Sequence, residues 1–167
     1  MKKTIVLLFA LGIAFISSSQ TSNEHFEKGN LKLISEDYKG AIDDFTKVIE
    51  INPKNAYAFT NRGRAKAELK DYKGAIDDYT NAIKINPKYV NAFISRGLAK
   101  AELKNYKGAI DDYNKAIEID PESDYAFNNR GIAKINIKQN DDGCKDLKKA
   151  IELGSVLAKE NFKKYCN

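Results

Sequence analysis

The sequence has few of the residues that most catalytic sites need. Its 167 residues include one histidine, His25, two cysteines and no tryptophan. It contains no pairing of a serine or cysteine nucleophile with a histidine base, and no glycine-rich loop of the kind that cradles phosphate. We therefore expect no enzyme activity and no cofactor.

Acidic pairs are the one feature that resembles catalytic carboxylates. They occur at residues 43–44, 77–78, 111–112 and 141–142. Neighbouring residues on a helix point about 100° apart, however, so the two members of a pair cannot share a site. Three of the pairs lie early in a predicted helix, where negative charge is favourable, and Asp43 and Asp111 each precede a lysine by four residues, a stabilising spacing. We interpret the pairs as a solvated helix face.

The chain has no long cluster of residues of one charge sign. The 28 lysines and arginines are interspersed with 23 acidic residues, whereas a nucleic-acid-binding surface is expected to carry a one-sided basic stripe. The one mild concentration comprises Lys145, Lys148, Lys149, Lys159, Lys163 and Lys164. We interpret it as a solvated end of the fold and expect no nucleic-acid partner.

Long apolar runs are missing apart from one near the N-terminus. The basic start MKK is followed by an apolar run over residues 5–16 and by the small residues SSSQ at 17–20. This order predicts a secretory signal peptide, residues 1–19. The alternative, a membrane anchor, would need about 20 apolar residues, and no cysteine follows the run to carry a lipid anchor. We expect a secreted or periplasmic protein with no stable membrane insertion after cleavage.

The remainder of the chain repeats with a period of 34 residues, which is the spacing of Gly40, Gly74 and Gly108 and of Pro53, Pro87 and Pro121. A fixed period of this length is typical of one structural unit stacked several times. The four units cover residues 22–55, 56–89, 90–123 and 124–155.

Each unit contains two helical patterns. In the second unit, apolar residues recur at helical spacing from Ala56 to Leu69 and from Tyr72 to Ile85. Asp71 is placed to cap the second helix. Asn86 is expected to end it, because the residue before a proline disfavours the helical conformation.

A glycine lies inside the first helix of every unit, at a cost of roughly 1 kcal/mol relative to alanine. These glycines are Gly29, Gly63, Gly97 and Gly131. We expect each to face the small residue twelve positions further on, so that the two helix backbones approach closely. Those residues are Ala41, Ala75, Ala109 and Gly143.

The order of aromatic, small and proline residues in a unit resembles a known family. The residues Phe59, Gly63, Ala75, Tyr79, Ala82 and Pro87, and their counterparts Phe93, Gly97, Ala109, Tyr113, Ala116 and Pro121, are similar to the tetratricopeptide repeat. The resemblance departs at Arg62, Arg96 and Arg130, where the family usually has leucine, and at Lys66, Lys100 and Lys134, where it often has tyrosine. Because these residues recur in step, we interpret them as a structural choice of a subfamily.

The fourth unit is atypical, as terminal repeats are expected to be. Gly143-Cys144 replaces Ala-Ile, and residues 156–165 then form one further amphipathic pattern. The predicted fold is therefore all-α: an α-solenoid of four 34-residue helix–turn–helix repeats, with residues 156–167 as a capping helix.

The two cysteines lie on either side of a helix break at Gly154. Cys144 is ten residues before this glycine and Cys166 is twelve after it. Positions nearly equidistant from the turn of a helical hairpin face one another, so we predict a disulfide, which an oxidising compartment favours. Two separately buried thiols are the alternative. A metal site is the weaker hypothesis, because His25 lies at the opposite end of the chain.

Binding specificity is expected where residues vary between units while keeping one face of the first helix. By resemblance to tetratricopeptide domains, this face lines a concave groove that holds peptide segments of other proteins. The candidate groove residues are Asn30, Tyr57, Asn61, Arg64, Asn91, Ile94, Leu98, Tyr125, Asn128 and Asn129. Asparagine offers a donor and an acceptor that match a peptide bond, and tyrosine is typical of recognition hot spots. The alternative is that exposed positions vary because nothing constrains them.

The resemblance does not extend to the clamp with which some tetratricopeptide domains hold a C-terminal carboxylate. Asn30 and Asn61 match that clamp, but Phe26, Asn91 and Ser95 stand where it needs lysine or arginine. The sequence therefore predicts a non-catalytic adaptor that binds a peptide segment of another protein. The alternative is a structural module that self-associates through its repeat ends.

Overall fold

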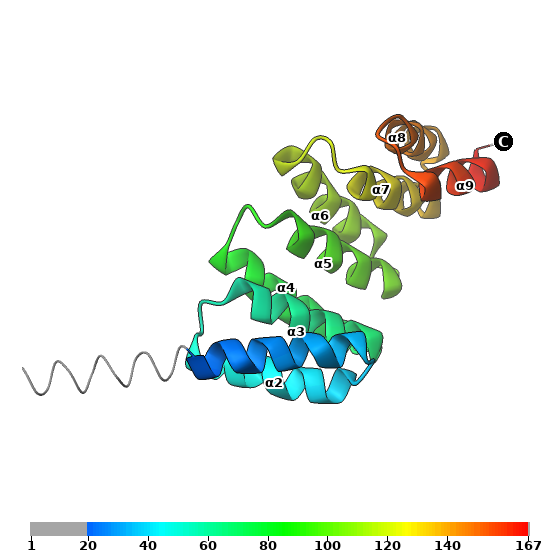
Figure 1. The fold of residues 1–167 in the computed structure, drawn as a ribbon. Coiled ribbons are helices and arrows are strands. Elements are labelled where there is room, and N and C mark those ends of the chain that lie inside the picture. Colours follow the sequence, from blue (N-terminus) through cyan, green and yellow to red (C-terminus); the bar gives the residue numbers. More distant parts are fainter. Residues whose placement is uncertain (1–19, 167) are drawn as a thin grey trace, which may run out of the picture.

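The computed structural model describes residues 20–166, which form a stack of helices. The chain is helical over residues 20–34 and then forms α2 (Tyr38–Ile51), α3 (Ala56–Glu68), α4 (Tyr72–Ile85), α5 (Val90–Glu102), α6 (Tyr106–Ile119), α7 (Asp124–Asn136), α8 (Asn140–Glu152) and α9 (Val156–Tyr165). The helices follow one another in space in chain order (Figure 1). The predicted α-solenoid with a final capping helix is thus confirmed. The predicted signal peptide, residues 1–19, lies outside the described residues.

Each helix pair turns through one residue in the left-handed conformation. Glu36, Lys70, Lys104 and Lys138 have φ of 61°, 63°, 60° and 65°. The next residues in the second unit then begin α4, because the Asp71 side chain accepts a hydrogen bond of 3.0 Å from the Gly74 backbone N–H. Asp71 therefore caps the helix as predicted, and Asn86 is the C-terminal cap residue of α4.

The glycine in the first helix of each unit allows a close approach. In the fourth unit its nearest partner is the predicted small residue, because a Cβ atom at Gly131 would lie 2.8 Å from the Gly143 backbone oxygen, whereas in the first three units it is an aromatic ring. A Cβ atom at Gly97 would lie 2.6 Å from the Tyr113 ring, and one at Gly63 would lie 2.9 Å from the Tyr79 ring. The backbone oxygen of Ala75, the small residue predicted to face Gly63, would be 3.2 Å away. In the first three units an aromatic ring from the second helix therefore packs over the glycine.

The hydrophobic core lies between successive units as well as within them. Phe45 and Val48 of α2, for example, form one buried cluster with Ala58 and Ala65 of α3. The same aromatic position is buried in the next two units, as Tyr79 and Tyr113. A single helix pair cannot bury both its faces, and stacking supplies the missing one.

Candidate functional site: the groove face and its supporting ion pairs

A buried ion pair joins the two helices in each of the second, third and fourth units. In the second unit, Arg62 donates two hydrogen bonds, of 3.0 and 2.7 Å, to the Asp78 carboxylate, and the Lys66 ammonium lies 2.7 Å from it. Asp78 is 2% exposed. The corresponding groups are Arg96, Lys100 and Asp112 in the third unit and Arg130, Lys134 and Asp146 in the fourth. We call these sets, together with Asp44 and its partners, the ion-pair ladder.

The ladder corrects the interpretation of the acidic pairs as a solvated face. The first member of the pair, such as Asp77, is exposed, but the second members Asp44, Asp78 and Asp112 are buried. A carboxylate can be buried in this way because an arginine and a lysine compensate its charge. The recurring Arg62 and Lys66 positions are therefore scaffold residues, as the sequence indicated.

Each ladder arginine also reaches back to the preceding unit. The third guanidinium nitrogen of Arg62 donates to the Thr46 hydroxyl at 3.0 Å, and that of Arg96 donates to Thr80 at 3.1 Å. Arg130 makes the equivalent bond, of 2.7 Å, to the Asn114 side chain. One side chain thereby holds the two helices of its own unit together and fixes the contact with its neighbour.

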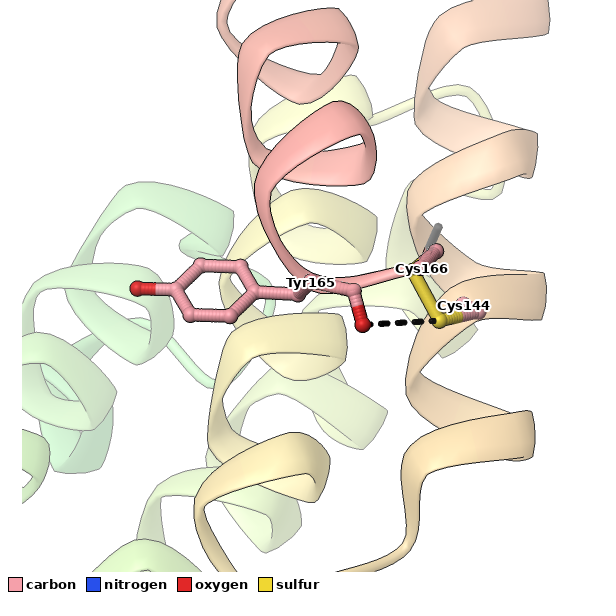
Figure 2. The surroundings of a disulfide bond; sticks show 3 residues. All are labelled: Cys144, Tyr165 and Cys166. Atoms are coloured by element: carbon pink, nitrogen blue, oxygen red, sulfur yellow. Dashed lines mark hydrogen bonds between the residues drawn. A yellow bond between two sulfur atoms is a disulfide. The ribbon is translucent and has the colours of Figure 1, made fainter.

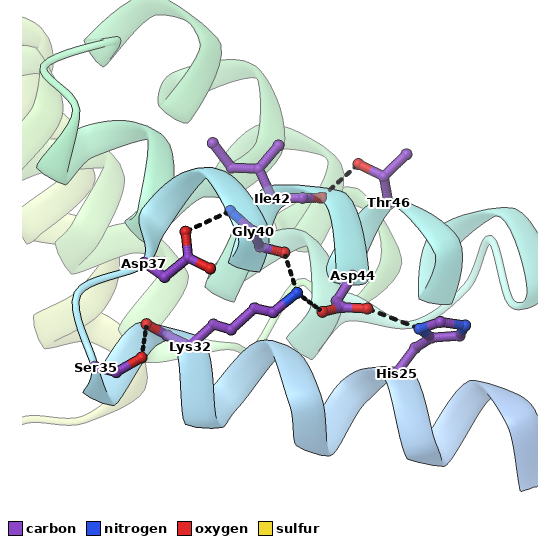
Figure 3. Close-up of polar contacts among 8 residues, drawn as sticks. All are labelled: His25, Lys32, Ser35, Asp37, Gly40, Ile42, Asp44 and Thr46. Atoms are coloured by element: carbon purple, nitrogen blue, oxygen red, sulfur yellow. Dashed lines mark hydrogen bonds and ion pairs between the residues drawn. The ribbon is translucent and has the colours of Figure 1, made fainter.

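In the first unit the ladder lysine and aspartate recur as Lys32 and Asp44, but His25 takes the place of the arginine (Figure 3). His25 Nδ1 lies 2.8 Å from one Asp44 carboxylate oxygen, and Lys32 Nζ lies 2.6 Å from the other. Burial favours a raised pKa for Asp44, but the hydrogen bonds from Lys32 and His25 outweigh it and hold the pKa below its ordinary value. Among the described residues no group of acidic, histidine and cysteine side chains could hold a metal ion. His25 is thus a structural partner of Asp44.

The predicted groove residues are exposed to different degrees. Tyr57 and Tyr125, at the same position of α3 and α7, are 60% and 64% exposed. Arg64, Asn91 and Leu98 are also exposed, while Asn30, Asn61, Ile94 and Asn129 are half-buried. These nine side chains are accessible from the face formed by the first helices of the units, which we call the groove face.

Asn128 differs from the other predicted groove residues, because it is only 1% exposed. Its side-chain oxygen accepts a hydrogen bond of 2.8 Å from Asn161 of α9. The capping helix therefore covers the groove face at this position. Asn128 supports the docking of α9 and is not available to a partner in this structure.

Clefts along the groove face include one of about 470 Å³ at Tyr125 and α9 and two that lie over the first three units. The first of these two, of about 230 Å³, is lined by Asn30, Leu33, Ile34, Asn61 and Arg64, and within it Asn61 donates a hydrogen bond of 2.9 Å to Asn30. The second, of about 410 Å³, lies between α3 and α5 and is lined by Arg64, Ala67, Glu68, Tyr72, Tyr79, Ser95, Leu98, Ala99 and Glu102. Arg64 belongs to both clefts. The two glutamates of the second cleft lie on the same varying face of the first helices, although they are not among the candidate groove residues.

The predicted cysteine pair, Cys144 and Cys166, forms a disulfide that ties the end of α9 to α8, with Cα atoms 5.7 Å apart (Figure 2). Beneath α9, Ala158 is buried against Leu147 and Ala150. No helix within residues 20–166 is long and apolar enough to cross a membrane.

Models of the tetratricopeptide repeat match residues 25–55, 56–89 and 97–136. The first tetratricopeptide domain of Spaghetti (RPAP3), bound to the HSP90 peptide SRMEEVD, is 31% identical, with 72% of this chain and 95% of that chain covered and a TM-score of 0.70. The chain therefore belongs to the tetratricopeptide repeat family, whose members are in general non-catalytic protein-interaction modules.

Two further solved structures are similar. The crystal structure of MamA is 26% identical with a TM-score of 0.76, over 86% of this chain and 81% of that chain. The second tetratricopeptide domain of human RPAP3, in complex with the HSP70 peptide SGPTIEEVD, is also 26% identical, with a TM-score of 0.68, over 70% of this chain and 98% of that chain. A comparison with curated protein sequences gives no significant match.

Proposed function

We propose that this protein is a non-catalytic scaffold that holds a segment of another protein on its groove face. The observation that carries the proposal is the separation of two sets of residues. Residues that recur from unit to unit form the core and the ion-pair ladder, whose arginine is present in the second, third and fourth units. Residues that vary, such as Tyr57, Arg64 and Leu98, are exposed, and two of these three line the clefts. The peptide complexes of two similar domains support a peptide segment as the partner.

We further infer that the protein works outside the cytoplasm, secreted or in the periplasm, without a cofactor, an enzyme activity or a nucleic-acid partner. The signal peptide predicted for residues 1–19 is the basis for the location. The disulfide supports it, because disulfides persist in oxidising compartments. Interspersed charge is the basis for excluding nucleic acid.

Affinity capture from a native cell-envelope extract tests the proposed function. The full chain is compared with a groove variant carrying Asn61→Ala, Arg64→Ala and Asn129→Ala. A matched control carries Lys47→Ala, Lys84→Ala and Glu118→Ala, at exposed positions of α2, α4 and α6. We expect one protein to be captured by the parent and the control and lost by the groove variant, with equal helicity in all three. Equal capture by all three would contradict binding on the groove face.

The alternative function, self-association through repeat ends, is favoured by one observation. Leu31 and Ile34 on the first helix are 66% and 80% exposed. A head-to-tail stack that continued the ladder is opposed, however, because α9 already packs on α8, where the next unit would lie, and is tied to it by the disulfide. Sedimentation of the full chain separates the two functions, because a monomer at every concentration would exclude self-association.

A further inference from the structure

The 410 Å³ cleft between α3 and α5 has an apolar and aromatic lining with charges at its sides. Leu98, Ala67 and Ala99 supply aliphatic surface, and Tyr72 and Tyr79 of α4 supply ring surface. Leu98 is 44% exposed, so part of this surface is open to solvent. The cleft therefore offers contact area to the aliphatic part of a side chain.

Glu68 and Glu102 give the cleft its distinctive chemistry. They are the last residues of α3 and α5, where the partial negative charge of a helix C-terminus makes a carboxylate unfavourable. The corresponding residues in the first and fourth units are Ile34 and Asn136, so the repeat itself does not require an acid here. Two adjacent units thus place acidic residues where they weaken the helix.

The two carboxylates are not neutralised by an ion pair with any other described residue. Burial, and next the charge of the Glu102 carboxylate, raise the pKa of the Tyr72 hydroxyl, so this carboxylate lies close to the tyrosine on the cleft wall. Arg64 is the one cation of the cleft lining, against two carboxylates and two helix C-termini. The cleft therefore keeps a net negative charge.

We propose that this cleft takes a lysine or arginine side chain of the partner segment, with its aliphatic stem against Leu98 and its cation between Glu68 and Glu102. This proposal rests on the proposed function and names the chemistry of its partner. Lysine and arginine combine an aliphatic stem with a charged head, which matches the lining and the charge of the cleft. The preference is the reverse of the acidic peptides seen on the similar RPAP3 domains.

Three immobilised peptide pools test the proposal with the full, disulfide-bonded chain. Each pool consists of blocked nonapeptides of random sequence with a fixed central residue: lysine, norleucine or glutamate. Norleucine keeps the aliphatic stem of lysine without its charge. We expect roughly three- to tenfold more protein to be retained on the lysine pool than on the norleucine pool, because two partly exposed ion pairs form. The excess should shrink as salt screens the charges.

The variant Glu68→Gln/Glu102→Gln should lose the preference for lysine while keeping its fold. The midpoint temperature of its thermal unfolding should equal or exceed that of the parent, because the substitutions remove two negative charges that are unfavourable at helix C-termini. The control variant Glu118→Gln/Glu122→Gln, at exposed positions elsewhere, should keep the preference. Equal retention on the lysine and norleucine pools, or a preference that survives Glu68→Gln/Glu102→Gln, would overturn the basic-residue site alone. Retention on none of the pools would overturn the proposed peptide binding itself.

Discussion

The two ends of the solenoid are held in different ways. At the C-terminal end, α9 buries Ala158 against α8 and is tied by the disulfide between Cys144 and Cys166. At the N-terminal end, the first helix has no covalent tie among the described residues and exposes Leu31. There, Asp44 is paired with the recurring ladder lysine, Lys32, and with His25 where the other units have an arginine. The interior units stand between, each linked to its neighbour by an arginine.

The difference shows what the ladder arginines contribute. Where a preceding unit exists, Arg62, Arg96 and Arg130 stand at the position that reaches it. Where none exists, Lys28 stands at that position and a histidine satisfies Asp44 from the same helix. The arginine is therefore a connection between units as much as a partner for the aspartate. We expect stability to fall from the interior toward the N-terminal end.

The largest effect is expected from breaking the ladder in the interior. Asp112→Ala would leave Arg96 and Lys100 without their shared carboxylate, and removing one partner of a buried pair costs about 3–5 kcal/mol. Asp44→Ala should cost less, about 1–2 kcal/mol, because His25 and Lys32 are more exposed. Urea unfolding followed by circular dichroism measures both.

The neighbouring Asp111 is the matched control for this experiment. It is exposed, so Asp111→Ala should change the free energy of unfolding by less than about 0.5 kcal/mol. Equal losses for Asp44→Ala and Asp112→Ala would contradict the distinction between the end and the interior.

Removing the disulfide should make the C-terminal end resemble the other one. The cysteines are 22 residues apart, and constraining a loop of this length stabilises by about 3 kcal/mol in the chain-entropy model. In Cys144→Ser/Cys166→Ser, the amide protons of α9 should exchange as fast as those of residues 20–34. Unchanged protection of α9 would show that packing on Leu147 and Ala150 alone retains it.

A smaller effect is expected from His25, which replaces part of the arginine fork in the first unit. His25→Ala removes one hydrogen bond to Asp44 while Lys32 keeps the other carboxylate oxygen paired. The free energy of unfolding should fall by about 1 kcal/mol. Arg96→Ala removes two hydrogen bonds to Asp112 and one to Thr80 of the preceding unit, so it should lower the free energy of unfolding several times more. Similar losses for the two variants would contradict the difference between the first unit and the interior.

The smallest effect concerns pH at the N-terminal end. The folded-state pKa of Asp44 lies below its ordinary value of 3.8. Its contribution to stability is therefore present above pH 3.8 and is lost as the pH falls through the lowered pKa. The stability difference between the parent and Asp44→Asn should therefore shrink as the pH falls below 3.8. A difference that grows in acid would show that the pKa is raised instead.

Much of the fold could be predicted from the sequence, because the 34-residue period presents the same helical pattern in each of the four units. The helices, the Asp71 cap and the cysteine pair depend on residues near one another in the chain or symmetric about a turn. The burial of Asp78 depends on a residue 16 positions away on another helix. Its signal was present, since Arg62 and Asp78 recur at the same separation in each internal unit.

The candidate site was less accessible to sequence reasoning. Asn128 has the same helical position as Ile94, which is half-buried, and it also contacts Asn161 of the docked α9. Glu68 and Glu102 lie on the varying face of their helices, but the sequence does not show that they line one cleft. Their proximity emerges only when α3 and α5 stand side by side.

The backward reach of the ladder arginines also bears on how such a chain can change in length. A tandem duplication of residues 90–123 would set the duplicated Arg96 opposite Asn114, the acceptor that Arg130 already uses. The boundary between the two copies would then have the same arginine–asparagine hydrogen bond as the boundary before Arg130. A single duplication could therefore lengthen the protein without any further substitution. Duplicating the first or the fourth unit would instead put Lys28 or Lys148 at an internal boundary. Duplication of the third unit is thus compatible with the hydrogen bonds between units, whereas duplication of the first or the fourth unit is not.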